Sequence, residues 1–348
     1  MRVLFIGDIF GKPGRKALFE KLQGLVQTHQ VDFCIANVEN AAGGFGLTPQ
    51  IAEEFLRAEI DVLTTGNHIW DKHAILPYLT QQPRLLRPHN YPPAAPGTGL
   101  FIGDSRCGVR VAVISLQGRV YMPSIDCPFA VGEAAVEEVR RQTKVVLVDF
   151  HAEATSEKQA FAWYVDGRVS AVVGTHTHVQ TADERILPRG TAFITDLGMT
   201  GPYDSVIGSI PDLALERFLK QIPARLEPAS GNLRFCGAVV EIEESSGLAI
   251  SITRSNIPAC FQTSDSPSLE ERPEQLLKSE VGSTEEAVKY RHTGERTAAH
   301  GVIHVLERLS GAVEFVGEAQ GGQHRHLQGV DRARRGSQFA HPRIEAGA

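Results

Sequence analysis

Apolar, strand-like segments of this sequence end repeatedly in residues that can bind a metal ion. In an open α/β sheet, ligands bind at the carboxyl ends of the parallel strands, which meet at one edge of the sheet. Polar clusters that lie far apart in the sequence can therefore form a single site. Five clusters follow this pattern: Asp8, Glu39-Asn40, Asn67-His68, His151, and the pair His176 and His178. The chain therefore needs a fold that brings five strand ends together.

Up to about residue 260 the sequence alternates β-rich segments with amphipathic helical segments, which is typical of an α/β sheet covered by helices. Thr48-Pro49 has the form of a helix N-cap followed by proline at the first helical position. Further helices are predicted over residues 131–142, 155–165 and 211–220. Residues 235–242 and 248–252 are predicted to form an antiparallel hairpin that closes the domain.

The composition excludes several classes of protein. The chain has 348 residues, of which 42% are hydrophobic, and its formal net charge is -6. No block of basic residues alternates with aromatic ones, so we expect no nucleic-acid track. Five scattered cysteines without C-x-x-C spacing predict free thiols in a reducing cytosol. No apolar stretch reaches membrane-spanning length, so we expect a cytoplasmic protein without a membrane partner. The sequence leaves open whether the chain forms a homo-oligomer.

The composition changes beyond Cys260. Residues 261–348 are rich in Gly, Ser, Glu, Arg and His, and they hold six of the thirteen histidines without the spacing of a ligand motif. We predict one folded domain over residues 1–260 and a low-complexity, disordered tail over residues 261–348. A small helical appendage is the alternative for this tail.

His176 and His178 are separated by one residue and follow an apolar run over residues 170–173. Side chains two residues apart on an extended backbone point to the same side. We therefore expect both imidazoles to face one site. For either histidine alone, a hydrogen-bonded structural role would be the commoner outcome, but five suitably placed clusters favour metal binding.

The polar clusters contain enough ligands for two metal ions. A two-metal site needs a bridging carboxylate, terminal ligands, and open positions for water and substrate. Glu39 is the expected bridge. One ion would be held by Asp8, Asn40 and His178, and the other by Asn67, His151 and His176. Imidazole and oxygen ligands without thiolate favour iron, manganese or zinc over magnesium alone. A hydroxide that bridges such ions can attack the phosphorus of a small phosphodiester substrate.

The leaving alkoxide of such a reaction needs a proton donor. His68 follows the predicted ligand Asn67 directly, and neighbouring side chains on an extended segment point apart. His68 can therefore approach the substrate without binding metal, and we predict that it is the general acid. His73 is a weaker candidate for the same role.

Three further features have more than one interpretation. Asp149 could replace His151 as a ligand or orient a neighbour from behind. Arg119 could hold a phosphate, although an arginine on the surface is the more frequent outcome. The glycine-rich segment 43–46 lacks the Lys-Ser/Thr ending of a phosphate-binding P-loop, so we interpret it as a flexible border of the site.

The ordered blocks around these residues resemble those of calcineurin-like metallophosphoesterases, and more narrowly those of the bacterial YmdB family. The resemblance covers roughly residues 1–256. It rests on Asn40-Ala41-Ala42-Gly43, on Gly66-Asn67-His68-Ile69-Trp70-Asp71-Lys72, on Thr175-His176-Thr177-His178-Val179-Gln180-Thr181-Ala182-Asp183, and on the segments 149–158 and 196–204. It implies that residues 1–260 form a metallophosphoesterase domain, a four-layer αββα sandwich. It also implies a di-iron phosphodiesterase that acts on cyclic nucleotides, with 2′,3′-cyclic nucleotides as the expected substrates.

The chain departs from the wider superfamily at two positions. Phe10 stands where that pattern has a histidine ligand, and Glu39 stands where it has a bridging aspartate. The resemblance to the YmdB family implies that Asn40 replaces the missing histidine. Iron remains the expected metal, with manganese or zinc as alternatives.

Two other functions are compatible with these residues. A phosphomonoesterase or nucleotidase could use the same metal site. A regulator without enzymatic activity could use the metals structurally or bind a nucleotide as a signal. Comparison of phosphodiesters with monoesters on one preparation would separate the two enzymes, and a folded but inactive variant would test the regulator.

Overall fold

The computed structural model describes residues 1–259. The predicted tail over residues 261–348 lies outside the described residues. The described part is a mixed α/β structure with two sheets and six α-helices. None of the helices in this part combines the length and the apolar character that crossing a membrane requires. The cysteines in this part are free thiols, as predicted.

The first sheet contains both ends of the described chain. Its strands are arranged in the order β2-β11-β12-β1-β3-β4, with β13 paired to β12. Their bounds are β1 Arg2–Ile6, β2 Asp8–Ile9, β3 Phe33–Asn37, β4 Val62–Thr64, β11 Met199–Pro202, β12 Leu233–Ile242 and β13 Ala249–Pro258. Strands β1, β3 and β4 are parallel, so their carboxyl ends lie at one edge. The predicted closing hairpin is confirmed, because β12 and β13 pair antiparallel.

The second sheet is built from the middle of the chain, in the order β5-β6-β7-β8-β10-β9. Its strands are β5 Leu100–Asp104, β6 Arg110–Gln117, β7 Val145–His151, β8 Ala171–Thr175, β9 Arg185–Ile186 and β10 Ala192–Ile194. Strands β6, β7, β8 and β10 are parallel. The carboxyl ends of β7 and β8 therefore also share one edge.

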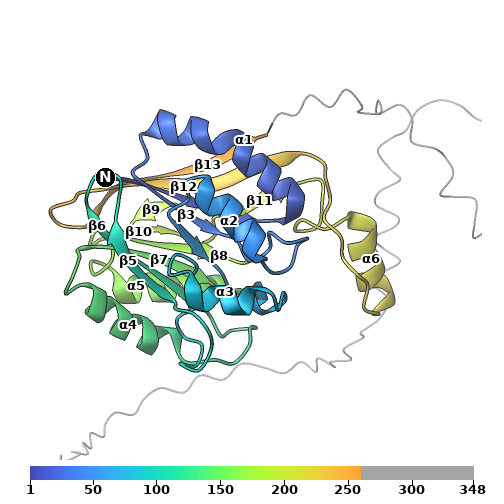
Figure 1. The fold of residues 1–348 in the computed structure, drawn as a ribbon, viewed down its shortest axis with the longest axis horizontal. Coiled ribbons are helices and arrows are strands. Elements are labelled where there is room, and N and C mark those ends of the chain that lie inside the picture. Colours follow the sequence, from blue (N-terminus) through green and yellow to red (C-terminus); the bar gives the residue numbers. More distant parts are fainter. Residues whose placement is uncertain (260–348) are drawn as a thin grey trace, which may run out of the picture. The chain divides into compact units, whose positions relative to one another are not determined.

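The two sheets pack face to face, and helices cover their outer faces (Figure 1). Phe5 of the first sheet and Leu147 of the second belong to the same buried core between the sheets. Helices α1 (Gly11–His29) and α2 (Pro49–Arg57) cover the first sheet. Helices α4 (Pro128–Val139) and α5 (Thr155–Val165) cover the second. The burial of apolar side chains in all three interfaces holds these layers together.

The helix boundaries follow local sequence signals. The Thr48 hydroxyl accepts a hydrogen bond from the Ile51 N–H at 3.4 Å, and Pro49 opens α2 as predicted. The predicted helix 131–142 spans residues 128–139 instead, and its earlier start follows from Pro128, whose fixed φ suits the first helical turn. Between β4 and α3 (Ile75–Gln81), residues Asn67–Trp70 form a short 3-10 helix, η1.

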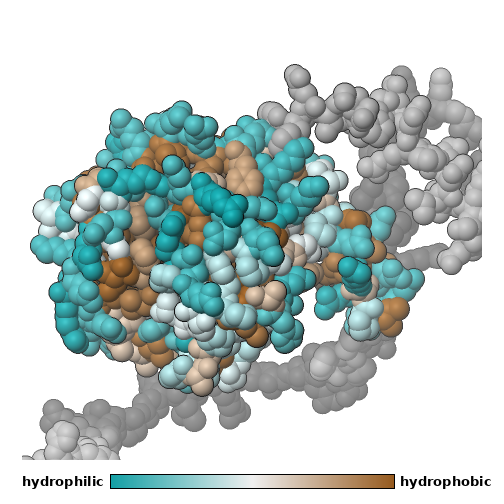
Figure 2. All heavy atoms as spheres, viewed as in Figure 1, coloured by the Kyte–Doolittle hydropathy of each residue, from teal (hydrophilic) through white to brown (hydrophobic). Residues whose placement is uncertain are grey.

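Helix α6 (Pro211–Lys220) has the predicted bounds but differs from the other helices because it buries only Ala214. Its side chains Leu215, Phe218 and Leu219 are exposed. Figure 2 shows hydrophobic side chains among polar ones over this helix, which Figure 1 places at the side of the sandwich.

Candidate metal centre

The carboxyl ends of the strands in both sheets converge on a cavity of about 450 Å³. Glu39, Asn40, His68, His176 and His178 line this cavity. Asp8 and His151 are fully buried, and each lies within 4.0 Å of a lining side chain. Asn67 contacts His151. The structure therefore brings all eight residues singled out in the sequence into one region.

Four of the eight side chains meet around the Nε2 atom of His151. This nitrogen lies 3.0 Å from Oε1 of Glu39, 3.2 Å from Oδ1 of Asn67 and 3.1 Å from Nδ1 of His176. The potential ligand atoms of Glu39, His151 and His176 all lie within 4.8 Å of one another. Two imidazole nitrogens and two oxygens thus converge on one place, which suits a transition metal.

A second group of potential ligands surrounds His178. Its Nε2 atom lies 3.3 Å from Oδ1 of Asn40 and 4.0 Å from Oδ1 of Asp8. Oδ2 of Asp8 accepts a hydrogen bond from the backbone N–H of His176, whereas Oδ1 is buried without a hydrogen-bond partner among the described residues. A buried carboxylate oxygen without a partner is costly unless something positive neutralises it. This oxygen therefore fits the place of a cation.

Hydrogen bonds behind His151 fix the orientation of its ring. Its Nδ1 lies 2.9 Å from Oγ1 of Thr175, and the Thr175 hydroxyl donates to Oδ1 of Asp149 at 2.7 Å. Thr175 therefore accepts the Nδ1 proton, and Nε2 is the ring atom that faces the other potential ligands. Asp149 also accepts hydrogen bonds from Asn37 and Thr64. It thus orients His151 through Thr175, a link that the sequence did not reveal.

His178 and His176 have partners of their own. The carbonyl oxygen of Ile207 accepts the Nδ1 proton of His178 at 2.9 Å, which directs its Nε2 towards Asn40. Nε2 of His176 lies 3.2 Å from Oε2 of Glu153. Glu153 was not among the predicted site residues, although its position two residues after His151 was a usable signal.

The backbone at the two histidines is not extended, so the prediction that they alternate along a strand is wrong. Strand β8 ends at Thr175, and His176 and His178 have φ values of 101° and 65°. Residues other than glycine rarely adopt positive φ, and they keep it where surrounding contacts enforce it. Both imidazoles nevertheless reach the site, because a turn rather than a strand presents them.

A buried carboxylate holds this histidine turn. Asp196 accepts hydrogen bonds from the Thr177 N–H at 3.2 Å and from the Thr177 hydroxyl at 2.8 Å. The buried Lys158 ammonium binds the same carboxylate at 2.6 Å. The turn is therefore anchored by an ion pair that lies beneath it.

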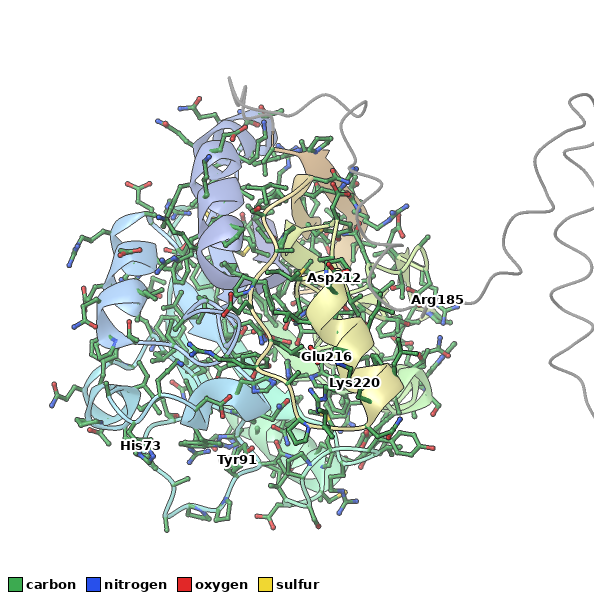
Figure 3. All side chains as sticks on the ribbon, turned by 90° about the vertical axis from the view of Figure 1, so that its right-hand side faces the viewer. His73, Tyr91, Arg185, Asp212, Glu216 and Lys220 are labelled. Atoms are coloured by element: carbon green, nitrogen blue, oxygen red, sulfur yellow. The ribbon has the colours of Figure 1, made fainter. Side chains whose placement is uncertain are left out.

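His68 is also placed differently from the prediction, because it lies in η1 rather than on an extended segment. Its backbone N–H donates to Oε2 of Glu39 at 2.9 Å, and its ring Nδ1 lies 2.9 Å from Oδ2 of Asp71. The ring of Phe45 packs edge-on against it. These contacts hold an imidazole at the cavity wall with its Nε2 available. His73 is exposed and does not line this cavity (Figure 3).

Carboxyl and imidazole groups shift one another's pKa values in the buried centre. Burial raises the pKa of Asp8 well above its usual value, and the carboxylate of Asp196 acts in the same direction. Burial also opposes ionisation of Glu39, but His151 outweighs it and lowers the pKa of Glu39 to about 2. Although burial lowers the pKa of His151, Glu39 and Asp8 raise it to about 9. Burial and the neighbouring His151 lower the pKa of His176 to about 3. A dication could replace the His151 proton as the balancing charge.

The close approach of the backbone to His151 requires glycine at residue 66. A Cβ atom at Gly66 would lie 2.2 Å from Nε2 of His151. Such a contact is far shorter than any that packed atoms adopt, so a larger residue would push the His151 ring out of place. Gly66 therefore leaves the space in which Asn67 and His151 meet.

Asn40 and Phe10 both lie beside His178. The ring of Phe10 packs edge-on against that of His178. The amide nitrogen of Asn40 donates to the carbonyl oxygen of Gly44 at 2.9 Å, which leaves the amide oxygen facing His178. The donor set of this chain therefore suits metal binding, and the Asn40 oxygen is the donor atom that faces His178.

The two remaining sequence features lie at the surface and at the cavity border. Arg119 is exposed and lines neither the metal cavity nor its neighbours among the described residues. Its N–H donates to the carboxylate of Glu157. In the glycine-rich segment 43–46, Phe45 lines the metal cavity. This segment thus borders the cavity, and its flexibility stays a prediction.

Comparison with known proteins identifies similar chains. The model of a family described as YmdB-like protein matches residues 4–255. The chain is 46% identical over 254 residues to a Bacillus subtilis protein named 2′,3′-cyclic-nucleotide 2′-phosphodiesterase, a match that covers 73% of this chain and 96% of that protein. A hypothetical protein from Thermus thermophilus superposes with a TM-score of 0.70 at 40% identity, covering 74% of this chain and 99% of that one. A structure described as a novel phosphatase from Mycoplasma pneumoniae also has a TM-score of 0.70, at 32% identity, with 74% and 93% covered.

Proposed function

Because this chain belongs to the YmdB-like protein family, we propose that it is a metal-dependent phosphodiesterase that hydrolyses 2′,3′-cyclic nucleotides. One observation carries the proposal: metal-binding side chains from both sheets converge on one cavity, and His68 is held separately at its wall. The name of the Bacillus subtilis relative supports the choice of substrate. The helix–sheet–sheet–helix arrangement supports assignment of residues 1–260 to the αββα fold of calcineurin-like metallophosphoesterases.

We assign two metal ions to this cavity, and Glu39 would be the carboxylate that both share. Asn67, His151 and His176 would hold one ion, and Asp8, Asn40 and His178 the other. Bound iron, manganese or zinc would polarise the phosphate oxygens and activate water as the nucleophile. The protein orients the three histidines through Thr175, Ile207 and Glu153, which bind their outer nitrogens.

His68 is the proposed general acid. Asp71 binds its Nδ1, so the imidazole has a fixed orientation and its Nε2 can face a substrate in the cavity. A proton on this nitrogen can pass to the ribose oxygen that leaves phosphorus when the cyclic ester opens. The backbone N–H of His68 also donates to Glu39. The proposed general acid is therefore held close to the proposed bridging carboxylate.

The proposal is tested by a substrate panel on protein whose metal content has been measured. We expect about two transition-metal ions per chain and a higher kcat/KM for 2′,3′-cyclic AMP than for 3′,5′-cyclic AMP, a simple diester or AMP. A preparation that carries the metals but hydrolyses only monoesters would support the phosphomonoesterase instead. Protein that binds no metal after anaerobic reconstitution would contradict both enzymes.

A His68→Ala variant separates acid catalysis from metal binding. It should keep its metal content and lose roughly 10²–10⁴-fold in kcat, the usual contribution of a general acid. The control is His73→Ala, which removes an exposed histidine that does not line the cavity. Wild-type turnover in the His68 variant would remove this residue from the mechanism.

A further inference from the structure

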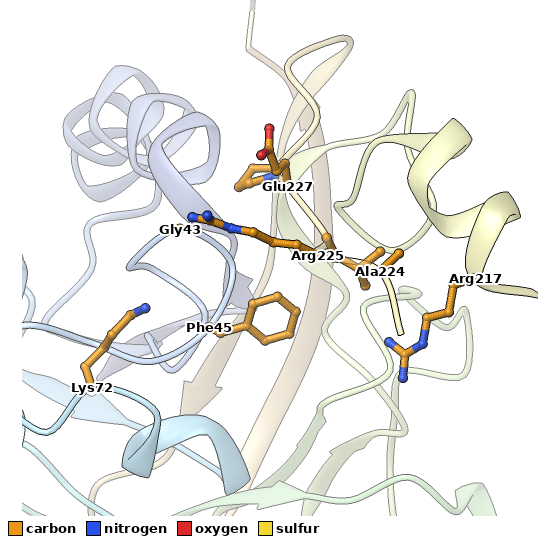
Figure 4. A pocket seen from close by; sticks show the side chains of 9 residues that line it. Gly43, Phe45, Lys72, Arg217, Ala224, Arg225 and Glu227 are labelled. Atoms are coloured by element: carbon orange, nitrogen blue, oxygen red, sulfur yellow. The ribbon is translucent and has the colours of Figure 1, made fainter. Parts of the chain in front are cut away.

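A second cavity, of about 590 Å³, adjoins the metal cavity. The two cavities share Phe45, Arg217 and Leu226 as lining residues, so they lie next to each other on either side of these side chains. Figure 4 shows the ring of Phe45 between Lys72 on one side and Arg217 on the other. A molecule bound at the metal centre can therefore extend past Phe45 into the second cavity.

The second cavity carries positive charge although the whole chain carries a formal net charge of -6. Lys72, Arg217 and Arg225 line it, and Glu227 is the single acid among its nine lining residues. Figure 4 shows the Glu227 carboxylate at the upper border. Within residues 1–259, no ion pair or side-chain hydrogen bond involves any of the three cations. Like charges that gather without partners repel one another, and an anion bound among them would relieve this repulsion.

The three cations come from separate segments of the chain. Lys72 follows Asp71, the partner of His68, and the stem of Lys72 packs so closely on Gly46 that a Cβ there would lie 2.7 Å from its Cγ. Arg217 lies on α6, and Arg225 lies on the segment that follows this helix. Helix α6 thus contributes a cation to the cavity although little of the helix is buried.

We propose that this cavity binds a second phosphate group of the substrate, attached to the 5′ oxygen of the nucleotide whose 2′,3′-cyclic phosphate is hydrolysed. The inference rests on the proposed function and names its substrate class more closely. Guanidinium groups bind phosphate through paired hydrogen bonds, which a lysine reinforces as a point charge. The scissile phosphate would lie near Glu39 and Glu153, whose charge bound metals would offset, whereas the second phosphate would meet cations of the protein itself.

A 5′-phosphate has two chemical sources. It can be the terminal phosphate of a mononucleotide, or it can link the cyclic nucleotide to a preceding nucleotide at the end of an RNA. Both place negative charge on the 5′ side of the ribose. The test therefore uses three substrates: 2′,3′-cyclic AMP with a 5′-hydroxyl, the same nucleotide with a 5′-phosphate, and an adenosine dinucleotide that ends in a 2′,3′-cyclic phosphate.

For the metal-loaded full-length protein, we expect kcat/KM to be about tenfold higher for one or both phosphate-bearing substrates than for the 5′-hydroxyl substrate, a gain consistent with a few exposed ion pairs. The preference should fall as salt is added, because exposed charges are screened. A preference shared by both substrates indicates recognition of the phosphate itself, and a preference for the dinucleotide alone identifies an RNA end as the source.

In the double variant Arg217→Gln/Arg225→Gln, the ratio of kcat/KM for the phosphate-bearing substrates to kcat/KM for the 5′-hydroxyl substrate should fall close to one. Lys72→Gln should lower it by a smaller factor and keeps the test decisive if the double variant folds poorly. The matched control is Lys220→Gln on the same helix, where Lys220 pairs with Glu216 at the surface and does not line the cavity (Figure 3). This control should keep the wild-type preference.

Three outcomes distinguish the subsite from the proposed function. Efficient hydrolysis of the 5′-hydroxyl substrate, with no preference for a second phosphate in the wild type, would overturn the subsite and leave the phosphodiesterase intact. A preference that survives unchanged in the variants would also overturn the subsite, because the phosphate would then bind elsewhere. Failure of metal-loaded protein to hydrolyse any of the three substrates would overturn the proposed function, and the subsite with it.

Discussion

The two sheets contribute chemically different halves of the site. The proposed oxygen ligands lie at the start of β2 and just after β3 and β4 of the first sheet. The proposed nitrogen ligands lie at the end of β7 and just after β8 of the second sheet. The oxygen half consists of Asp8, Glu39, Asn40 and Asn67, and the nitrogen half of His151, His176 and His178. Neither half alone has the mixed donor set of the proposed centre. The site therefore depends on how the sheets pack against each other.

A polar link joins the two halves at the end of the apolar core. Asn37 on β3 and Thr64 on β4 donate hydrogen bonds to the carboxylate of Asp149 on β7. Thr175 on β8 donates to the same carboxylate and accepts from His151. A buried network of this kind stabilises one arrangement when all its members are satisfied. It ties the orientation of a histidine on one sheet to side chains on the other.

Removal of the charge where the halves meet should have the largest effect. Glu39→Gln keeps the shape of the side chain but loses the anion that lies 3.0 Å from His151. We expect metal binding to fail and kcat/KM to fall by more than about 10²-fold, since loss of even an outer partner of a ligand costs roughly 10–100-fold. Metal analysis and steady-state kinetics measure this, with exposed Glu137→Gln as the control. Full metal content with normal turnover would show that the halves do not meet at Glu39.

The halves also differ in how the backbone presents their ligands. His176 and His178 have positive φ in a turn that Asp196 and Lys158 hold, whereas no ligand of the oxygen half has positive φ. The nitrogen half is thus the one that depends on an unusual backbone and on a buried ion pair. It should be the more sensitive half when that pair is broken.

Lys158→Met tests this difference. The substitution keeps an unbranched apolar stem but leaves the Asp196 carboxylate buried without its cation, which typically costs about 3–5 kcal/mol of stability. We expect a lower unfolding free energy in urea and, because the turn loses its anchor, metal affinity reduced roughly 10–100-fold. Exposed Lys12→Met is the control. Wild-type metal affinity in a destabilised Lys158 variant would mean that the turn holds without the ion pair.

The same contrast explains how much of the molecule could be predicted from the sequence. Apolar runs that end in polar residues are local signals, so they were sufficient to place Asp8, Glu39 and His151 at strand ends. The backbone at His176 depends instead on Asp196, which is distant in the sequence, so a local pattern could not reveal the turn. The outer partners of the histidines were missed for a related reason, since a hydroxyl or a loop carboxylate has no distinctive spacing.

A smaller effect is expected at Asp183, which anchors the chain beyond the histidine turn. Its carboxylate accepts hydrogen bonds from the Thr195 N–H at 3.1 Å and from the hydroxyls of Thr195 and Thr181. Burial raises the pKa of Asp183, but these hydrogen bonds outweigh it and hold the pKa below its usual value. The ionised form is therefore favoured by folding. Its contribution to stability is fully present above the unfolded-state pKa of about 3.9 and is lost as the pH falls through the lower folded-state value.

Asp183→Asn should accordingly lower the unfolding free energy by about 1 kcal/mol at neutral pH, a modest value because the carboxylate is only half-buried and water screens it. In urea unfolding curves, the difference from wild type should stay constant from pH 7 to about pH 5 and shrink below about pH 4. Exposed Asp126→Asn should show no such difference. If the difference in unfolding free energy between wild type and variant stayed constant below about pH 4, Asp183 would act through its shape rather than its charge. In that case the nitrogen half would depend on charge only at Asp196. The ion pair between Asp196 and Lys158 would then be the one electrostatic feature that distinguishes this half from the oxygen half.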